Sequence, residues 1–334
     1  MNMKLKYDVK NCKNPVIPLL GMPGVKLSKT SLRENLTCSE IQYETLSMLI
    51  DRFEPDGIFP LMDLTVEVEA LGLKIDFPRN GHPAVSSHPI KNKEDLIALK
   101  RNWIGISGRM NIFSKLIEKM AKNYSLLKGA YVIGPFSMAG ELMGAQDIAL
   151  NVMLNPKLVM ECIDFSLQII SDYARTLFNA GADTIAVLEP LAVILSPKQY
   201  KEFSLKPFKK LLSRLDDRSL ILHICGNTNH LVELMCDSGA AGFSLDSDVN
   251  FKELKKIIPE DIVLIGNLAP VDVFLHSTPD EVARATHKLV DEMKDAKNFI
   301  LSSGCDIPME TPLTNIDAFM KAARKTSKRM ILEV

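Results

Sequence analysis

Histidine and cysteine stand at two places in the sequence where a buried strand is expected to end in a loop. Residues 220–227 (LILHICGN) carry His223 and Cys225 two positions apart. Side chains two apart on a strand project to the same side, so we expect this imidazole and thiol to lie together. Residues 298–305 end in the same way, in Gly304 and Cys305. Three such ligands with one open position are typical of a catalytic zinc site.

The pair of His223 and Cys225 is weak evidence by itself. Cysteine is common as a small buried residue, and histidine often serves as a hydrogen-bonded core or loop residue. Cys305 strengthens the metal hypothesis, because it too follows an expected strand. The four other cysteines have no partner at ligand spacing, and we interpret them as structural: Cys12, Cys38, Cys162 and Cys236.

Composition restricts the class of protein. The chain has 334 residues, of which 46% are hydrophobic and 24% charged, as in a soluble globular protein with a large core. Its formal net charge of −1 gives no reason to expect a nucleic acid or an anionic membrane as partner. We find no apolar run of about 18 residues and no signal-peptide pattern in residues 1–10. We therefore expect a cytoplasmic protein with reduced cysteines.

Short apolar runs alternate with amphipathic stretches along the chain, which predicts an α/β protein with a (β/α)8 TIM barrel. The eight expected strands are 14–20, 57–61, 129–136, 183–188, 220–225, 241–245, 262–266 and 298–302. Residues 66–90 contain several glycines and prolines, and we expect a hairpin insertion there, after the second strand. No linker divides the chain, so residues 14–334 are predicted to form one barrel domain and residues 1–13 an N-terminal extension.

Polar side chains follow the expected strands, and in a barrel of this kind reactive groups gather at the carboxyl ends of the strands. Besides the three metal-ligand candidates, we expect Asp63, Glu189, Asp246 and Asn267 at this end. Asp246 or Glu189 could orient the His223 ring or contact substrate. Residues 137–144, which include Met138 and Gly140, are small and flexible. They suit either a loop that a bulky ligand approaches closely or a helix start packed on the core.

Several segments resemble one known family. The stretches LHICGN, GADTIAVLEP, VLIGNLAP, SSGCDIPMETP and LTVEVEALG are similar to the uroporphyrinogen decarboxylase superfamily, and more narrowly to its methylcobalamin:coenzyme M methyltransferases. The resemblance covers about residues 14–324. It implies a catalytic zinc (Zn2+) held by His223, Cys225 and Cys305. The Arg-Gln-Ala-Gly-Arg segment of the true decarboxylases is missing, since no arginine precedes Arg33 in this chain.

The resemblance implies transfer of a methyl group from methylcobalamin, or another methylated corrinoid, to a thiol that zinc activates. No histidine has aspartate two residues before it and glycine three after it, so no lower cobalt ligand of the D-x-H-x-x-G kind is evident. We therefore expect the methyl group to arrive on a separate corrinoid protein or on free methylcobalamin, with Met138, Gly140 and Asn267 as contacts to the corrinoid. Glu189, Asp246 and Asp63 are the candidate catalytic residues.

Other functions remain open at this stage. Transfer could run in the opposite direction, loading a corrinoid protein from a small methylated donor. The barrel could instead be a decarboxylase that uses Asp63 in place of zinc, or a zinc-bearing binding subunit without turnover. The acceptor could be coenzyme M, homocysteine, another thiol or a pterin.

Overall fold

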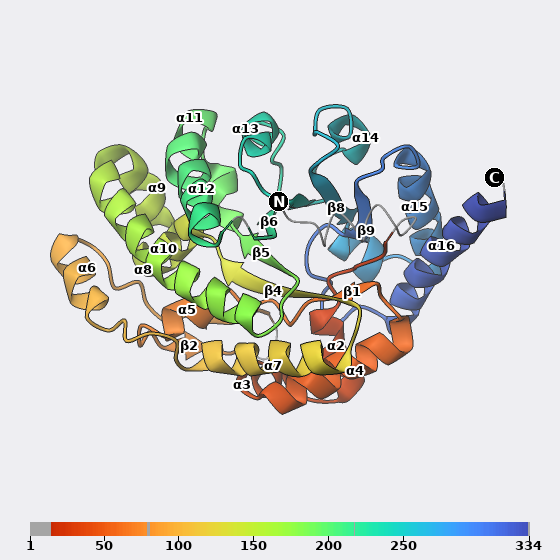
Figure 1. The fold of residues 1–334 in the computed structure, drawn as a ribbon, viewed down its shortest axis with the longest axis horizontal. Coiled ribbons are helices and arrows are strands. Elements are labelled where there is room, and N and C mark those ends of the chain that lie inside the picture. Colours follow the sequence, from red (N-terminus) through yellow and green to blue (C-terminus); the bar gives the residue numbers. More distant parts are fainter. Residues whose placement is uncertain (1–14, 79–80, 217, 333–334) are drawn as a thin grey trace.

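A curled sheet of seven parallel strands forms the centre of the protein (Figure 1). The computed structural model describes residues 15–78, 81–216 and 218–332. The strands pair in the order β1-β4-β5-β6-β7-β8-β9. Strands of this sheet that follow one another along the chain are therefore also neighbours in the sheet. The strands are β1 (Gly57–Ile58), β4 (Leu127–Ile133), β5 (Thr184–Leu188), β6 (Leu220–Ile224), β7 (Gly242–Leu245), β8 (Val263–Leu268) and β9 (Phe299–Ser303). This is the architecture of a TIM-like barrel.

The expected first strand, residues 14–20, is reduced over its described residues 15–20 to a single bridge between Val16 and Leu301. Hydrogen bonds still join this segment to both sheet edges, because the Ile17 N–H donates to the Leu301 carbonyl and the Asp56 N–H donates to the Val16 carbonyl. A longer ladder is prevented by Pro15 and Pro18, which have no N–H to donate. The prediction of a regular strand was therefore wrong, although the segment does lie between the two edges.

Helices cover the outside of the sheet (Figure 1). The long ones are α4 (Ser39–Phe53), α7 (Arg109–Asn123), α10 (Pro156–Asn179), α15 (Pro279–Glu292) and α16 (Leu313–Leu332). Shorter helices are α2 (Gly21–Ser28), α3 (Leu32–Thr37), α5 (Val66–Glu69), α6 (Lys93–Lys100), α8 (Pro135–Met143), α9 (Ala145–Leu154), α11 (Pro197–Tyr200), α12 (Lys206–Arg214), α13 (Val232–Cys236) and α14 (Phe251–Leu254). Three irregular helical turns complete the set: η1 (Pro190–Ile194), η2 (Lys201–Leu205) and η3 (Pro270–Leu275).

Alternation along the strands separates two layers of the core. On β6, Ile221 belongs to the hydrophobic cluster inside the barrel, whereas Leu220 and Leu222 belong to the larger cluster between sheet and helices. His223 has the same parity as Ile221 and is 2% exposed, so its ring projects into the barrel at the carboxyl end of β6. The strand therefore positions one chemically active side chain at the top of a closely packed interior.

The segment 66–90 differs in part from the expected hairpin. It begins with the helical turn α5, and it contains a separate antiparallel pair, β2 (Ile75–Asp76) with β3 (Ala84–Val85). Residues 79–80 between these strands lie outside the described residues, so the hairpin insertion stays a prediction. The expected N-terminal extension, residues 1–13, also lies outside them.

Candidate metal centre

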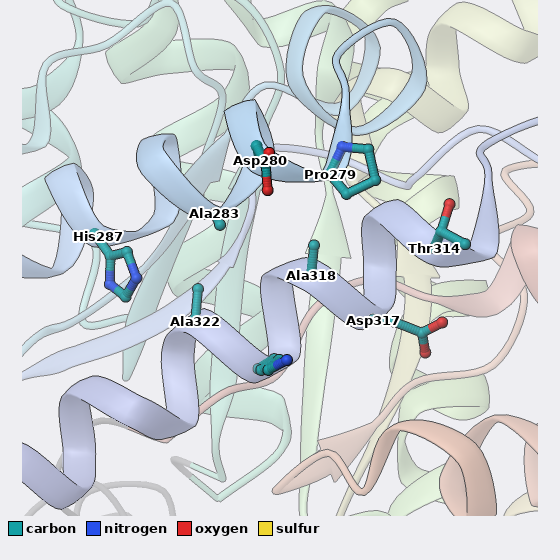
Figure 2. Close-up of a pocket in the computed structure, with 9 residues that line it drawn as sticks. Pro279, Asp280, Ala283, His287, Thr314, Asp317, Ala318 and Ala322 are labelled. Atoms are coloured by element: carbon teal, nitrogen blue, oxygen red, sulfur yellow. The ribbon is translucent and has the colours of Figure 1, made fainter.

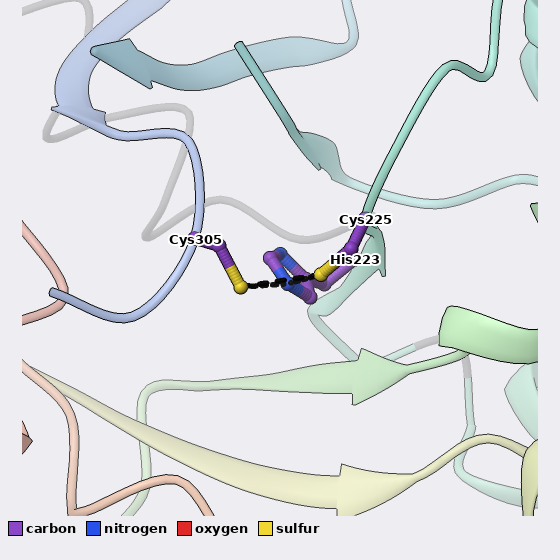
Figure 3. A group of neighbouring side chains, drawn as sticks. All are labelled: His223, Cys225 and Cys305. Carbon is purple, nitrogen blue, oxygen red and sulfur yellow. Dashed lines mark hydrogen bonds between the residues drawn. The ribbon is translucent and has the colours of Figure 1, made fainter. Parts of the chain in front are cut away.

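The three predicted ligands meet at one point although 80 residues separate the two cysteines. The Cys225 sulfur lies 3.1 Å from Nε2 of His223 and 3.2 Å from the Cys305 sulfur, and the Cys305 sulfur lies 3.6 Å from the same nitrogen. Figure 3 shows both sulfur atoms beside the imidazole ring. Among the residues that the structure describes, no other group of three or more histidine, cysteine or acidic side chains brings its donor atoms as close together.

Two loops at the carboxyl ends of β6 and β9 deliver these side chains. His223 is still part of β6, and Cys225 follows the strand directly, before Gly226 turns the chain with a φ of 78°. Cys305 follows Ser303 and Gly304 at the end of β9. Because β6 and β9 lie in one curled parallel sheet, their carboxyl ends face the same mouth of the barrel. The predicted convergence of the ligands is thus a consequence of the fold.

A hydrogen bond joins the two thiols and shifts their pKa values in opposite directions. The hydrogen bond from Cys225 lowers the pKa of the Cys305 thiol well below its usual range, and His223 adds to this effect. The bond to Cys305, together with burial, raises the pKa of Cys225. These contacts therefore favour a thiolate at Cys305, which is the form that binds a metal cation.

Ser244 is the residue that orients the histidine, and the sequence analysis missed it. Its hydroxyl lies 2.9 Å from Nδ1 of His223, on the neighbouring strand β7. If Nδ1 carries the proton and Ser244 accepts it, Nε2 is left free to bind a metal ion. A polar residue between Phe243 and Leu245, with the parity that points into the barrel, was the signal that could have identified it.

We predict that Ser244→Ala weakens metal binding by about 10–100-fold, because the ring loses the bond that fixes its tautomer and orientation. Competition with a chromophoric chelator measures this affinity. Ser219→Ala is the matched control, since Ser219 is also buried but lies at the opposite end of β6. Equal zinc affinity in the wild type and the Ser244→Ala variant would show that the serine does not support the ligand.

Glu189 and Asp246 do not orient His223. Both carboxylate oxygens of Glu189 accept backbone N–H bonds, from Phe136 at 3.2 Å and Ser137 at 2.5 Å, at the start of α8. Burial raises the pKa of Glu189 to about 7, and these bonds partly oppose that rise. Asp246 instead accepts from the Gly226 N–H at 2.9 Å and from its neighbour Ser247. In this structure one carboxylate fixes a helix start and the other fixes a loop, and a direct part in catalysis stays a prediction for both.

Asn267 anchors the same region of the mouth. Its side-chain amide donates to the carbonyls of Asp246 and Val249, at 2.9 and 2.8 Å. The amide group is thereby engaged with the turn after β7. Contact between Asn267 and a corrinoid remains a prediction.

Met138 and Gly140 lie in helix α8, so the helix interpretation of residues 137–144 is the one that the structure has. Met138 is 0% exposed and belongs to the hydrophobic core. A Cβ at Gly140 would lie 2.1 Å from the Leu191 side chain, so glycine allows close packing there. Their placement supports a packing role, and contact with a corrinoid stays a prediction without support from the geometry.

Asp63 is held in a buried network that includes Arg109, which sequence reasoning did not single out. Arg109 forms an ion pair with Asp63 and another, at 2.6 Å, with Glu69. It also donates a hydrogen bond to the Thr65 hydroxyl. Thr65 in turn donates to Asp63 from its N–H and its hydroxyl. The ion pair between Asp63 and the Arg109 guanidinium supports a structural role for Asp63. It gives no support to the alternative of a decarboxylase that uses Asp63 in place of zinc.

Glu67 lies beside this network and gives a pH-dependent prediction. Burial raises the pKa of its carboxyl to about 8, although a hydrogen bond from the Ile133 N–H opposes the rise. Its pKa in the unfolded chain is about 4.3, so unfolding releases a proton between about pH 4.5 and 8 and is favoured as the pH rises. We expect Glu67→Gln, which has no such proton to lose, to gain stability relative to the wild type across this window. Urea unfolding at several pH values measures the difference, and a constant difference would contradict the assignment.

A groove between α15 and α16 has a volume of about 530 Å³ (Figure 2). Its lining includes Asp280, His287, Asp317 and Lys321, and Asp317 is paired with Arg52 at 2.6 Å. None of the three predicted metal ligands lines it. The groove lies between two outer helices and offers no clustered metal ligands, so we place the candidate chemistry at the barrel mouth.

The chain belongs to the uroporphyrinogen decarboxylase family, because the sequence model of that family matches residues 15–326. Methylcobamide:CoM methyltransferase MtbA of Methanosarcina acetivorans is 31% identical over 269 residues, which cover 78% of this chain and 77% of that protein. The MtbA of Methanosarcina mazei is also 31% identical, over 278 residues and the same shares of the two chains. These relatives confirm the resemblance to the methyltransferase branch, and with it that the chain is an enzyme of this kind.

A solved structure supports the same architecture. A methyltransferase from Methanosarcina mazei, 23% identical, superposes with a TM-score of 0.86 over 97% of this chain and 98% of its own. That similarity shows the fold alone. Over the described residues, the helices are all too short or too polar to cross a bilayer.

Proposed function

We propose that the protein transfers a methyl group from a methylated corrinoid, carried by a partner protein, to a thiol bound at a zinc ion. The observation that carries the proposal is the convergence of His223, Cys225 and Cys305 within 4.8 Å at the barrel mouth. The names of the relatives support it, since they act on methylcobamide and CoM. The proposal includes one catalytic domain, residues 14–334, acting in the cytoplasm.

The chemistry of the donor set fits zinc. One imidazole and two thiolates are ligands that zinc prefers, and the lowered pKa of Cys305 favours the anionic form required for binding. His223, Cys225 and Cys305 would hold the ion and leave one position for substrate. When bound, zinc keeps a substrate thiol deprotonated near neutral pH and so supplies a nucleophile.

The residues of the chain then tune and orient that nucleophile. Two thiolates and a neutral imidazole would cancel the charge of a bound zinc ion, so a substrate thiolate there would keep its negative charge and its reactivity. Ser244 holds the His223 ring, and Asp246 holds the loop after Cys225. In the proposed transfer, the substrate sulfur forms a bond to the methyl carbon while the cobalt–carbon bond breaks. The electron pair of the broken bond stays on cobalt. Exclusion of water and in-line placement of the two partners are the remaining contributions of the barrel.

Purified protein mixed with methylcobalamin and a panel of thiols tests this function. We expect the methylcobalamin absorbance to fall with coenzyme M, homocysteine or another thiol, and the methylated thiol to appear in equal amount. Cys305→Ser is the matched control, because we expect it to keep the fold and to lose one of the proposed ligands. If no thiol is methylated faster than in the control, while a methylated donor loads the corrinoid, transfer runs in the opposite direction and the proposal is wrong.

A further inference from the structure

The turn after β7 contacts both loops that carry the cysteine ligands. Asp246 and Ser247 form this turn, and Oδ2 of Asp246 accepts the Gly226 N–H at 2.9 Å. Gly226 is the residue that follows Cys225. The other carboxylate oxygen, Oδ1, accepts the N–H and the hydroxyl of Ser247, at 2.6 and 3.0 Å. The carboxylate is thus fixed by its own turn while it holds the first cysteine loop.

The opposite side of the turn packs against the second cysteine loop. A Cβ at Gly304 would lie 2.7 Å from the backbone nitrogen of Ser247 and 3.2 Å from Cα of Asp246. Backbone atoms cannot move aside as the end of a flexible side chain can, so only glycine allows this approach. Gly304 directly precedes Cys305, and its N–H donates to the Leu268 carbonyl at 2.8 Å.

The turn itself is anchored to the barrel. Asn267 on β8 donates to the carbonyl of Asp246 at 2.9 Å, and also to that of Val249. On the strand that leads into the turn, Ser244 contacts His223. The end of β7 therefore lies against the backbone or the side chain of every ligand-bearing segment.

We propose that the Asp246–Ser247 turn is a clamp that sets the separation of the two cysteine ligands, with Asp246 and Gly304 as positioning residues. This inference rests on the proposed metal site. Asp246 fixes the loop of Cys225 through a hydrogen bond, and Gly304 fixes the loop of Cys305 through backbone contact. The two sulfur atoms lie 3.2 Å apart.

Metal affinity and the ligand-field spectrum of the cobalt(II)-substituted protein test the clamp without any methyl transfer. We expect Asp246→Ala and Gly304→Ala each to weaken zinc and cobalt(II) binding by about 10–100-fold and to alter the thiolate-to-cobalt absorption. Asp248→Asn is the matched control, since Asp248 is exposed, lies in the same segment and carries the same charge. It should leave both readouts unchanged.

Two further variants test whether the loss of affinity comes from positioning and not from unfolding, and whether Asp246 and Gly304 act through the same turn. Asp246→Asn keeps the size of the side chain, so its metal-free melting should match the wild type while its metal affinity falls. The double variant Asp246→Ala with Gly304→Ala should lose less affinity than the two single losses combined, because both act on one turn. Unchanged cobalt(II) spectra, fully additive losses, or a loss of affinity that only follows a fall in metal-free melting would each overturn the clamp. If instead the wild type itself binds no metal, the proposed function fails and not merely the clamp.

Discussion

Cys225→Ser and Cys305→Ser are each expected to reduce bound zinc from about one ion per chain to nearly none after dialysis. A serine hydroxyl does not ionise near neutral pH, so either change removes one of the two expected thiolate ligands and leaves one thiolate and one imidazole. The remaining two donors cannot hold the ion against exchange with solvent. Metal analysis of the purified variants measures the loss, and methyl transfer should disappear with it.

Cys236→Ser is the matched control for these variants. Cys236 is a free cysteine in α13, partly buried, and it is not one of the three clustered ligands. This variant should keep its zinc and its activity. If both ligand variants retained as much zinc as Cys236→Ser, the ion would have to be bound elsewhere and the assignment of the ligands would be wrong.

Removal of zinc by a chelator is expected to stop methyl transfer and to leave the fold intact. The ion is expected to contribute several kcal/mol to lowering the barrier, so turnover should fall by at least about 100-fold. The fold should persist because the core is extensive and the ligands lie in loops at its edge. Chains of about 300 residues bury about 75% of their unfolded surface, whereas it is chains below about 40 residues that usually need metals, disulfides or oligomerisation to fold.

Circular dichroism and thermal melting of the chelator-treated protein measure whether the fold persists without zinc. Near-native spectra and one cooperative transition are expected, and zinc should restore turnover when added back. Loss of the cooperative transition on chelation would make the site structural, as in a small zinc domain, and would contradict its interpretation as a catalytic centre.

The grouping of the three metal-ligand candidates was predictable because it depends on strand ends and on the period of side-chain alternation. His223 and Cys225 are two apart at the end of an apolar run, and Cys305 follows another such run, so a parallel barrel brings them to one mouth. The contacts of single carboxylates were not predictable in this way. Glu189 lies at a strand end as expected, but its side chain bonds the start of α8, and no pattern in the sequence specifies that direction.

Two other differences have local physical causes. Pro15 and Pro18 reduced the expected first strand to one bridge, and this could have been anticipated from the missing N–H groups. Arg109 was not anticipated, because its partners Asp63 and Glu69 are 46 and 40 residues away in the sequence and meet it only after folding. A buried ion pair leaves little trace in hydrophobic periodicity, whereas Ser244 does interrupt an apolar strand.

X-ray absorption at the zinc edge, recorded with and without the acceptor thiol and in the absence of any corrinoid, tests the central claim most directly. We predict that the shell of two sulfur atoms and one nitrogen from Cys225, Cys305 and His223 gains one sulfur from the substrate. About one proton per site should be released at the same time, since a free thiol with a pKa of about 8.5 is mostly protonated at neutral pH. A thiol that is methylated at a competent rate, yet never adds sulfur to the zinc shell, would contradict the account.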